Sequence, residues 1–330
     1  MKFNYYLPNN LITNDDLYKL SGNDPEWSDE QIIKKCGVRV RHISGDGELS
    51  SDMCLKATQK IFDEYGGDAS EIDFIVLCTQ SPDYPIPGTS FLIQNKLGLS
   101  KNIGAFDVNI ACSGYTYGLA IAKGLIMGGF AKKVLMCTSD MSATGSKFQP
   151  LAERILFSDS ATATIIDESN IHKIGKCVFG SDGSGFFSMY AKYGGCANPV
   201  NKQTHEKVFS SDDWNRPMKG EEVFLFTIRE VPPLVKNIVK ANDMSLDDVD
   251  FFIFHQANIL ILNALIKILK LPKEKVIIDI EEVGNTSSNS VAITLKRAME
   301  REPEKFKAGT KVLIAGYGIG LSWSGTILSL

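Results

Sequence analysis

The sequence lacks several features that would place it in common classes of protein. It has no hydrophobic run long enough to span a membrane, and Met1 to Pro8 contain no apolar segment of signal-peptide length. Its 35 basic residues are outnumbered by 39 acidic residues, giving a net charge of −4, whereas nucleic-acid-binding proteins usually carry a basic face. We therefore expect a cytoplasmic protein that binds neither membranes nor nucleic acids.

Metal-binding and hydrolytic motifs are also missing. The patterns C-x-x-C, H-E-x-x-H, G-x-S-x-G and Walker A do not occur. The seven cysteines are odd in number and irregularly spaced, and none of the four histidines pair at the spacing of metal ligands. This pattern predicts reduced, mostly buried thiols and no metal centre.

What is present is the composition of a globular protein with roughly two domains: 330 residues, of which 44% are hydrophobic and 22% charged. Short apolar runs typical of buried strands alternate with longer stretches typical of helices. The predicted strands are 74–78, 105–108, 133–137, 161–166, 251–254, 276–278, 311–315 and 326–328. The predicted helices are 51–65, 114–127, 223–241, 260–271 and 290–300. This alternation predicts a parallel or mixed sheet covered by helices.

The two halves of the sequence are similar to each other. Residues 72–77 recur as residues 249–254, and residues 133–137 recur about the same distance downstream as residues 311–315. The offset is too long for a solenoid repeat, so it predicts a duplicated α/β unit with a site between the two copies. No Pro/Ser-rich linker separates the copies, and we expect them to pack as one body.

Cys112 lies where the predicted strand 105–108 turns into the predicted helix 114–127. A thiol in this position faces unpaired N–H groups and the positive end of the helix. Such surroundings favour the thiolate and can lower the pKa of a cysteine to between about 3.5 and 7.5. We expect a nucleophile here, although a buried structural cysteine fits the same pattern.

Three other segments combine polar or glycine residues with predicted strand ends. His255 directly follows strand 251–254, where α/β folds place their sites, although a lone histidine is also a common structural residue. Asn285, in the small polar segment 284–290, is a candidate donor to an oxyanion, and this segment also fits a turn with a helix cap. Three glycines at 316–320 permit a loop with free N–H groups, suitable for an oxyanion hole.

Together these segments resemble β-ketoacyl-acyl-carrier-protein synthase III, a family with a thiolase-like fold. The similarity extends over almost the whole chain and rests on Cys112 at its turn, H-Q-A-N at 255–258, G-N-T-S-S-N-S at 284–290 and G-Y-G-I-G-L-S-W at 316–323. The resemblance implies a five-layered αβαβα fold made of two similar halves, 1–170 with the nucleophile and 171–330 with the histidine and asparagine. It also implies a homodimer.

The resemblance assigns roles to individual residues. Cys112 is the nucleophile, and His255 and Asn285 complete the catalytic set. The backbone N–H groups of Cys112 and Ile319 form the oxyanion hole. The residues expected to bound the substrate pocket are Phe157, Gly318, Gly320 and, across the dimer interface, Ile86.

The implied reaction is a decarboxylating Claisen condensation. An acyl group from acyl-CoA or acyl carrier protein is first held as a thioester on Cys112. A malonyl thioester on acyl carrier protein then loses carbon dioxide, and the resulting enolate attacks the acyl group. No metal or redox cofactor takes part in this chemistry.

Several positions depart from the family's CoA-primed members. Gln31 replaces an aromatic residue that stacks on adenine, Lys35 replaces an arginine, and Leu151 replaces a second adenine-stacking arginine. Trp27 and Arg154 lie nearby but out of register. Each lost stacking or cation–π contact is worth about 0.5–2 kcal/mol. One hypothesis is that CoA is a weak donor and the acyl group comes from a carrier protein or an unusual thioester; the alternative is that other residues hold the nucleotide.

The carrier-protein dock is the least specific expectation. Leu260 replaces an arginine that binds carrier protein in some members, while Lys267 and Lys270 are candidates for a basic dock. Lysines in this arrangement also fit a solvated helix face.

Three alternatives to the condensing enzyme stay open. One is a related acyltransferase that moves the acyl group to an amine or hydroxyl acceptor. Another is a non-catalytic partner subunit, which the presence of Cys112, His255 and Asn285 disfavours. A thiolase is disfavoured because its second cysteine is absent from the glycine-rich loop at 316–320.

Overall fold

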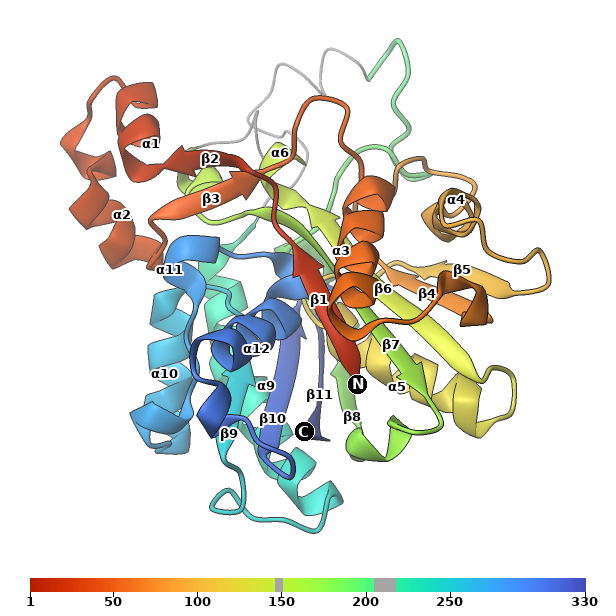
Figure 1. Cartoon of the computed structure of the whole chain (residues 1–330). Coiled ribbons are helices and arrows are strands. Elements are labelled where there is room, and N and C mark those ends of the chain that lie inside the picture. Colours follow the sequence, from red (N-terminus) through yellow and green to blue (C-terminus); the bar gives the residue numbers. More distant parts are fainter. Residues whose placement is uncertain (146–150, 205–217) are drawn as a thin grey trace.

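The computed structural model describes residues 1–145, 151–204 and 218–330 and contains two main β-sheets (Figure 1). The first sheet has the strand order β1 (Lys2–Tyr6), β7 (Asp159–Asp167), β6 (Lys133–Met141), β4 (Phe74–Cys78) and β5 (Gly104–Val108). The second has the order β8 (Val178–Ser181), β11 (Ser322–Ser329), β10 (Lys311–Gly318) and β9 (Phe251–Phe254). A separate pair joins β2 (Asn10–Thr13) to β3 (Val40–Ile43).

The two sheets repeat one topology. In the first, β4 is parallel to β6, and β7 lies antiparallel to both β6 and β1. In the second, β9 is parallel to β10, and β11 lies antiparallel to both β10 and β8. The sequence similarity between 72–77 and 249–254 thus corresponds to equivalent strands, as expected for a duplicated unit, while the division at residue 170 stays a prediction.

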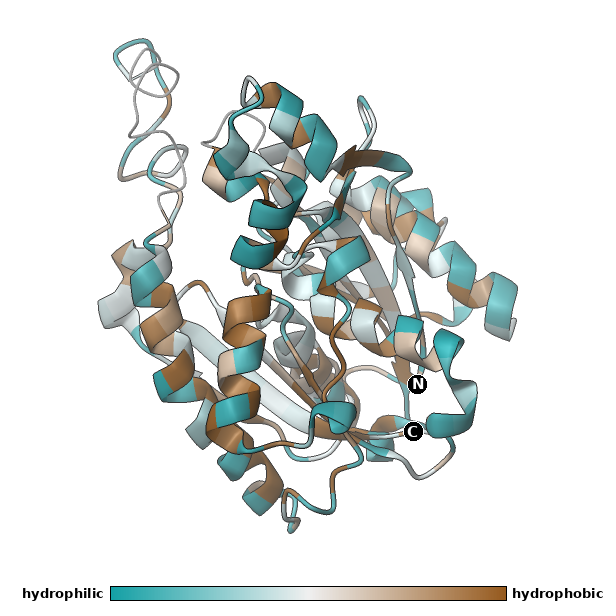
Figure 2. Ribbon diagram, turned by 90° about the vertical axis from the view of Figure 1, so that its left-hand side faces the viewer, coloured by the Kyte–Doolittle hydropathy of each residue, from teal (hydrophilic) through white to brown (hydrophobic). Residues whose placement is uncertain are grey.

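Helices form three layers around the sheets (Figures 1 and 2). On the outside of the first sheet lie α3 (Ser50–Tyr65) and α4 (Thr89–Lys96), and on the outside of the second lie α9 (Gly220–Ala241) and α10 (Ile259–Leu269). Between the sheets lie α5 (Gly114–Met127) and α12 (Ser290–Arg301). The order helix, sheet, helix, sheet, helix confirms the predicted five-layered thiolase-like fold.

The remaining helices within residues 1–145, 151–204 and 218–330 are short. They are α1 (Asn14–Leu20), α2 (Asp29–Cys36), α6 (Ser142–Gly145), α7 (Leu151–Arg154) and α11 (Ile280–Val283). Single 3-10 turns include η1 (Pro25–Trp27), η5 (Lys273–Lys275) and η6 (Ser287–Asn289). The last of these turns contributes to the site described below.

The central helices explain why the halves form one body. α5 is apolar and contains Tyr115 and Leu119, while α12 contributes Val291 and Leu295, and all four side chains lie in one buried cluster with residues of both sheets. The outer helices α3, α9 and α10 are amphipathic and bury one face each against their own sheet, as Figure 2 shows. Met1 and Leu330 also pack against the central cluster, so the two chain ends lie near each other (Figures 1 and 2).

Most predicted elements are present, with boundaries that differ by a few residues. The prediction of a strand at 276–278 is wrong. This segment follows η5 and forms only an isolated parallel bridge between Val276 and Phe252, with Ile277 donating to the carbonyl of Phe252 at 3.0 Å. It occupies the place next to β9 that β5 occupies next to β4, so one copy of the repeat has lost most of its edge strand.

The cysteines match the prediction of free and mostly buried thiols. All seven are free, and four of them are buried: Cys36, Cys54, Cys78 and Cys137. Within the described ranges, no helix is both long enough and apolar enough to cross a bilayer.

Candidate functional site

Cys112 lies in the turn between β5 and α5, two residues before the first residue of the helix. The end of β10 packs directly against this turn. A Cβ atom added to Gly318 would lie 2.9 Å from the sulfur of Cys112, and one added to Gly316 would lie 2.6 Å from the carbonyl oxygen of Cys112. Both contacts are closer than a side chain tolerates, so glycine allows the two halves to meet at the sulfur.

The thiol does not have the lowered pKa that the turn predicts. Burial raises the pKa of Cys112 to about 11, and the negative charge of Asp140 acts in the same direction. The hydroxyl of Ser287 and the N–H groups of Ile319 and Cys112 itself oppose this rise. The turn therefore aims donors at the sulfur as expected, but desolvation outweighs them in the free protein.

His255 directly follows β9 and is 2% exposed. Its Nδ1 lies 2.7 Å from the hydroxyl oxygen of Ser290, and its ring packs edge-on against Tyr317 with centroids 5.6 Å apart. Burial lowers the pKa of His255 to about 3, against a weaker opposite effect from the main chain of Ser287. The imidazole is therefore neutral near pH 7 and acts as a hydrogen-bonding group.

Asn285 is held on both its main chain and its side chain. Its N–H donates to the carbonyl of Leu156 at 2.8 Å, and its carbonyl accepts from the N–H of Ser158 at 2.9 Å. The side-chain oxygen accepts from the N–H of Ser287 at 2.9 Å, and Nδ2 donates to the carbonyl of Ala257 at 3.2 Å. These partners fix the orientation of the amide, and the second N–H of Nδ2 is left to donate to a substrate.

Ser287 links the three predicted residues, and the sequence analysis did not single it out. Its hydroxyl oxygen lies 4.0 Å from the sulfur of Cys112, its N–H binds Asn285, and its main chain lies against His255. Its φ is +52°, a left-handed conformation that is uncommon for a residue other than glycine. The sequence indicates segment 284–290 as a candidate, but it contains no signal that distinguishes Ser287 from Ser288 or Ser290.

A cavity of about 560 Å³ opens at Cys112, which is within the usual size of a small-molecule site. Of the predicted site residues, Ile319, Gly320 and Phe157 line it together with Cys112. Its other walls are largely apolar, and they include Ile110, Phe186, Met189, Tyr190 and Met218. These side chains provide an apolar environment for an acyl chain, and none of the five was predicted from the sequence to belong to the site.

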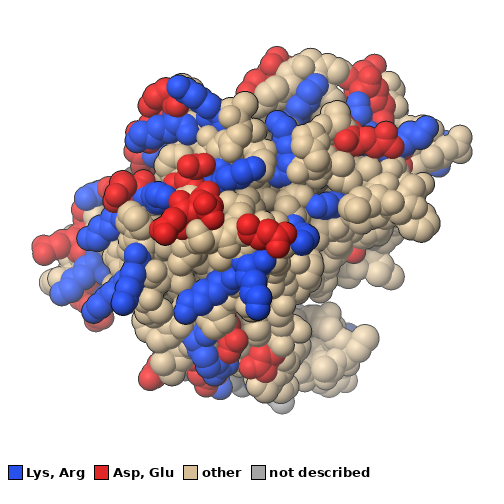
Figure 3. All heavy atoms as spheres, turned by 90° about the horizontal axis from the view of Figure 1, so that it is seen from below, with Lys and Arg blue, Asp and Glu red and all other residues tan. Residues whose placement is uncertain are grey.

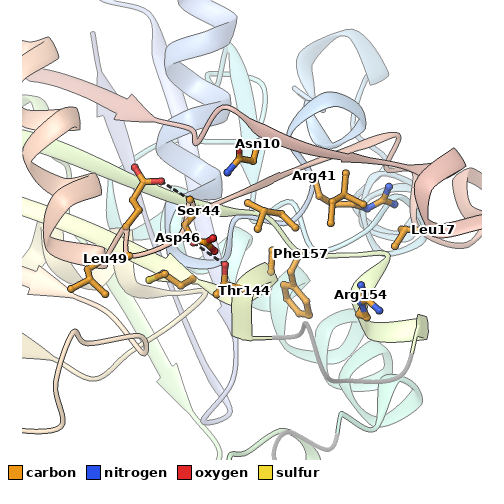
Figure 4. Close-up of a pocket in the computed structure, with 16 residues that line it drawn as sticks. Asn10, Leu17, Arg41, Ser44, Asp46, Leu49, Thr144, Arg154 and Phe157 are labelled. Carbon is orange, nitrogen blue, oxygen red and sulfur yellow. Dashed lines mark hydrogen bonds between the residues drawn. The ribbon is translucent and has the colours of Figure 1, made fainter. Parts of the chain in front are cut away.

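Phe157 also lines a second cavity of about 520 Å³, between the β2–β3 pair and the end of β6 (Figure 4). Its bridge to Asn285 places this phenylalanine beside the catalytic set, as the resemblance implies. Figure 4 shows Arg154 beside Phe157 at one end of the second cavity and Leu49 at the other. Burial lowers the pKa of Arg154, so its guanidinium is partly removed from water.

The positions where the sequence departs from CoA-primed members lie together on the surface near α2. The ammonium of Lys35 lies 4.3 Å from the ring centre of Trp27 and 3.0 Å from the carboxylate of Glu26. Leu151 packs with Trp27 against a small buried cluster around Ile32. One face of the indole is therefore already covered by a cation, and the leucine serves local packing.

The remaining predicted residues lie apart from the cavity. Ile86 is 85% exposed and is not among the described residues that line the cavity within one chain. Lys267 and Lys270 are exposed near the far end of α10, roughly 12 Å or more along the helix from Ile259, where the helix leaves the site. Figure 3 shows basic and acidic side chains interspersed on the lower face of the molecule.

Comparisons with known proteins agree with this architecture. Residues 106–183 match the family model described as 3-oxoacyl-(acyl-carrier-protein) synthase III, and residues 239–330 match the model of its C-terminal part. The chain is 32% identical to β-ketoacyl-(acyl-carrier-protein) synthase III 2 of Halalkalibacterium halodurans over 98% of this chain and 93% of that protein. It is 33% identical to the β-ketoacyl-(acyl-carrier-protein) synthase III of Ehrlichia canis over 98% of this chain and 96% of that one. A crystal structure of a 3-oxoacyl-(acyl-carrier-protein) synthase III superposes with a TM-score of 0.91 and 33% identity, covering 99% of this chain and 98% of that chain.

Proposed function

This chain belongs to the 3-oxoacyl-(acyl-carrier-protein) synthase III family, and from that premise we propose how its own residues carry out the reaction. The reaction is a decarboxylating Claisen condensation of an acyl thioester with a malonyl thioester. The single observation that carries the residue assignment is the position of Ser287, which contacts Cys112, His255 and Asn285 at once.

In the first half-reaction, the sulfur of Cys112 attacks the carbonyl carbon of the acyl donor. The N–H of Cys112 in the turn and the N–H of Ile319 directly after β10 both act on the sulfur, and they stabilise the tetrahedral oxyanion. The donor thiol leaves, and the acyl group stays on Cys112 as a thioester. Its chain extends into the apolar cavity beside Phe186 and Met189.

In the second half-reaction, His255 and Asn285 bind the thioester carbonyl of the malonyl group. A neutral imidazole and an amide N–H stabilise the enolate that forms as carbon dioxide departs, without transferring a proton to it. The enolate carbon attacks the acyl group on Cys112, the bond to sulfur breaks, and the β-ketoacyl thioester is released. The low pKa of His255 supports this role, because the ring stays neutral throughout the working range of pH.

The partners of the reaction follow from the same proposal. The donor is acyl-CoA or acyl carrier protein, and the extender is malonyl on acyl carrier protein, whose acidic surface Lys267 and Lys270 would meet. We also propose a cytoplasmic homodimer. β5 is the edge strand of the first sheet, paired with β4 on one side only, and Tyr84, Ile86 and Phe91 are all more than half exposed. A second copy covering this edge would bring Ile86 to the partner's pocket.

We further propose that acyl carrier protein is the better donor and CoA the weaker one. Trp27 is already covered by Lys35, and Leu151 offers no cation to an adenine ring. The expected loss relative to a sandwiched adenine is about 0.5–2 kcal/mol for each missing contact.

Intact-protein mass spectrometry tests both proposals. Wild type and Cys112→Ala are incubated with the same acyl groups on CoA and on acyl carrier protein. We expect wild type, but not Cys112→Ala, to form an acyl adduct with each donor that it uses. The adduct should form faster from acyl carrier protein than from CoA. Equal rates from short acyl-CoA would contradict the donor proposal, and no adduct from either donor on the folded protein would contradict the role of Cys112.

A further inference from the structure

Asp140 is a buried carboxyl that the chemistry above does not use. It is the penultimate residue of β6, it is 1% exposed, and it lines the same cavity as Cys112. Among the described residues, its hydrogen-bond donors are all neutral, whereas aspartates are seldom fully buried without a cation. A carboxyl kept in the catalytic cavity at this cost calls for a function.

The hydrogen bonds of Asp140 tie the first half of the protein to the turn that carries Ser287. One carboxyl oxygen accepts from the N–H of Gln80 at 3.0 Å. The other accepts from the N–H of Ser288 at 3.2 Å and from the hydroxyl of Ser288. Through Ser288, Asp140 is thus fixed beside Ser287, which precedes Ser288 in the same turn.

Ser287 lies between Asp140 and the nucleophile. Its hydroxyl oxygen is 4.0 Å from the sulfur of Cys112. Burial raises the pKa of the Asp140 carboxyl, and the Ser287 hydroxyl is among the hydrogen-bonding groups that act against this rise. In turn, the charge of Asp140 raises the pKa of Cys112, while the Ser287 hydroxyl lowers it. Thiol, hydroxyl and carboxyl therefore stand in sequence at one end of the cavity.

We propose that Ser287 and Asp140 form a proton relay for the thiol of Cys112, an inference that rests on the nucleophilic role proposed for this cysteine. As the sulfur attacks the acyl carbon, its proton passes to the Ser287 oxygen, and the serine's own proton passes to the Asp140 carboxylate. When the bond from the acyl carbon to the donor sulfur breaks, one proton returns along the same path to the leaving thiolate. One thioester and one thiol are consumed and one of each is formed, with no proton exchanged with solvent.

Between turnovers the same arrangement protects the nucleophile. The charge of Asp140 opposes ionisation of Cys112, so the resting cysteine is a neutral thiol, which reacts more slowly with oxidants than a thiolate does. The carboxylate then becomes an acceptor only when an acyl donor draws electron density from the sulfur. His255, with its low pKa, is poorly suited to accept this proton.

A purely structural role predicts a different outcome. If Asp140 only anchored the turn, removing the hydroxyl of Ser288 would act like removing the charge of Asp140.

The other thiol that Asp140 acts on is Cys78 of β4, which the charge of Asp107 also affects. Cys78 is fully buried, so peptide mapping after alkylation separates it from Cys112.

The test is the pH dependence of Cys112 alkylation by iodoacetamide, followed by mass mapping, together with the rate of acyl-adduct formation. Asp140→Asn should lower the midpoint of alkylation by about one pH unit, and Ser287→Ala should raise it. Both should slow acyl transfer by about 10²-fold. Ser288→Ala, which keeps the charge and the relay hydroxyl, is the matched control and should leave the midpoint near that of wild type.

Each outcome decides the proposal. Opposite shifts in the first two variants support it. An unchanged midpoint in Ser287→Ala, or shifts of the same sign in all three variants, would overturn it, and Ser287→Ala decides alone should Asp140→Asn fail to fold. A wild-type protein that forms no adduct on Cys112 would instead contradict the proposed function and is thereby distinguished.

Discussion

At the scale of single residues, the site depends on groups whose charge is set by burial. Of the ionisable side chains in the proposed reaction path, Cys112 and His255 are the two that contact the substrate, and burial favours the neutral form of both. The thiol pKa rises to about 11 and the imidazole pKa falls to about 3. The resting site is therefore uncharged at these two groups, and charge develops at the sulfur only during acyl transfer.

His255 should make the protein less stable in acid. Its folded pKa of about 3 lies below the ordinary value of 6.5, so between these values the unfolded chain binds a proton that the folded chain does not. The contribution of His255 to the free energy of unfolding is fully present above about pH 6.5 and is lost as the pH falls toward 3. Urea unfolding at pH 7.5 and pH 5.0 should show a smaller pH effect in His255→Gln than in wild type, and an equal effect in both would contradict the assignment.

Asn285 should act in the second half-reaction alone. Asn285→Asp keeps the oxygen that accepts from Ser287 but removes both N–H groups of Nδ2, the one that donates to Ala257 and the one left for the malonyl carbonyl. Acyl-adduct formation should stay within a few-fold of wild type, while release of carbon dioxide from malonyl thioester should fall by about 10²–10³-fold. Mass spectrometry of the adduct and a radioactive carbon dioxide assay measure the two steps separately, and a parallel loss of both would disprove this division.

At the scale of elements, the glycine-containing end of β10 determines where the nucleophile sits. Gly318→Ala would place a methyl group 2.9 Å from the Cys112 sulfur and Cβ, and a displacement of about 1 Å can cost 10²-fold in rate. We expect a folded protein with acyl-adduct formation slowed by about that factor. Gly124→Ala in α5 is the matched control, because nothing lies within 4 Å of the added carbon, and it should stabilise the fold by about 0.5–1 kcal/mol. Equal rates for the two variants would show that this end of β10 does not position the sulfur.

Elements were also the scale at which sequence was most informative. Apolar runs and helical periodicity predicted α5 and β9 to the residue, because these patterns report burial directly. The run at 276–278 has the same pattern but forms only one bridge to β9. Beyond this bridge, the side chain of Gln256 binds the carbonyl of Ile277 and the N–H of Asp279 in place of a strand partner. The roles of Ser287 and Asp140 were not predictable, because they arise from contacts between residues 148 or more positions apart. The resemblance assigned roles to Cys112, His255 and Asn285, but only the packed structure shows how burial sets the charge of Cys112 and His255.

At the scale of the whole molecule, one shared core joins the two halves. Leu295 of α12 is fully buried in the cluster that contacts both sheets, so Leu295→Ala should cost about 2–5 kcal/mol. Calorimetry and loss of activity should both report one transition at a lower temperature. Leu260→Ala, which truncates a side chain that is 52% exposed, should change stability by no more than about 0.5 kcal/mol. Two separated transitions in the Leu295 variant would mean that the halves unfold independently.

The closeness of Met1 and Leu330 makes the order of the two halves along the chain dispensable. Both ends pack against the central cluster, and a short glycine linker joining them would leave both sheets intact. Opening the joined chain at the exposed turn Glu168–Ser169, between β7 and β8, gives a circular permutant in which the half with His255 is synthesised first. This rearranged chain should form the same acyl-enzyme on its cysteine. The active site would then depend on how the two halves pack against each other and not on the order in which they are synthesised.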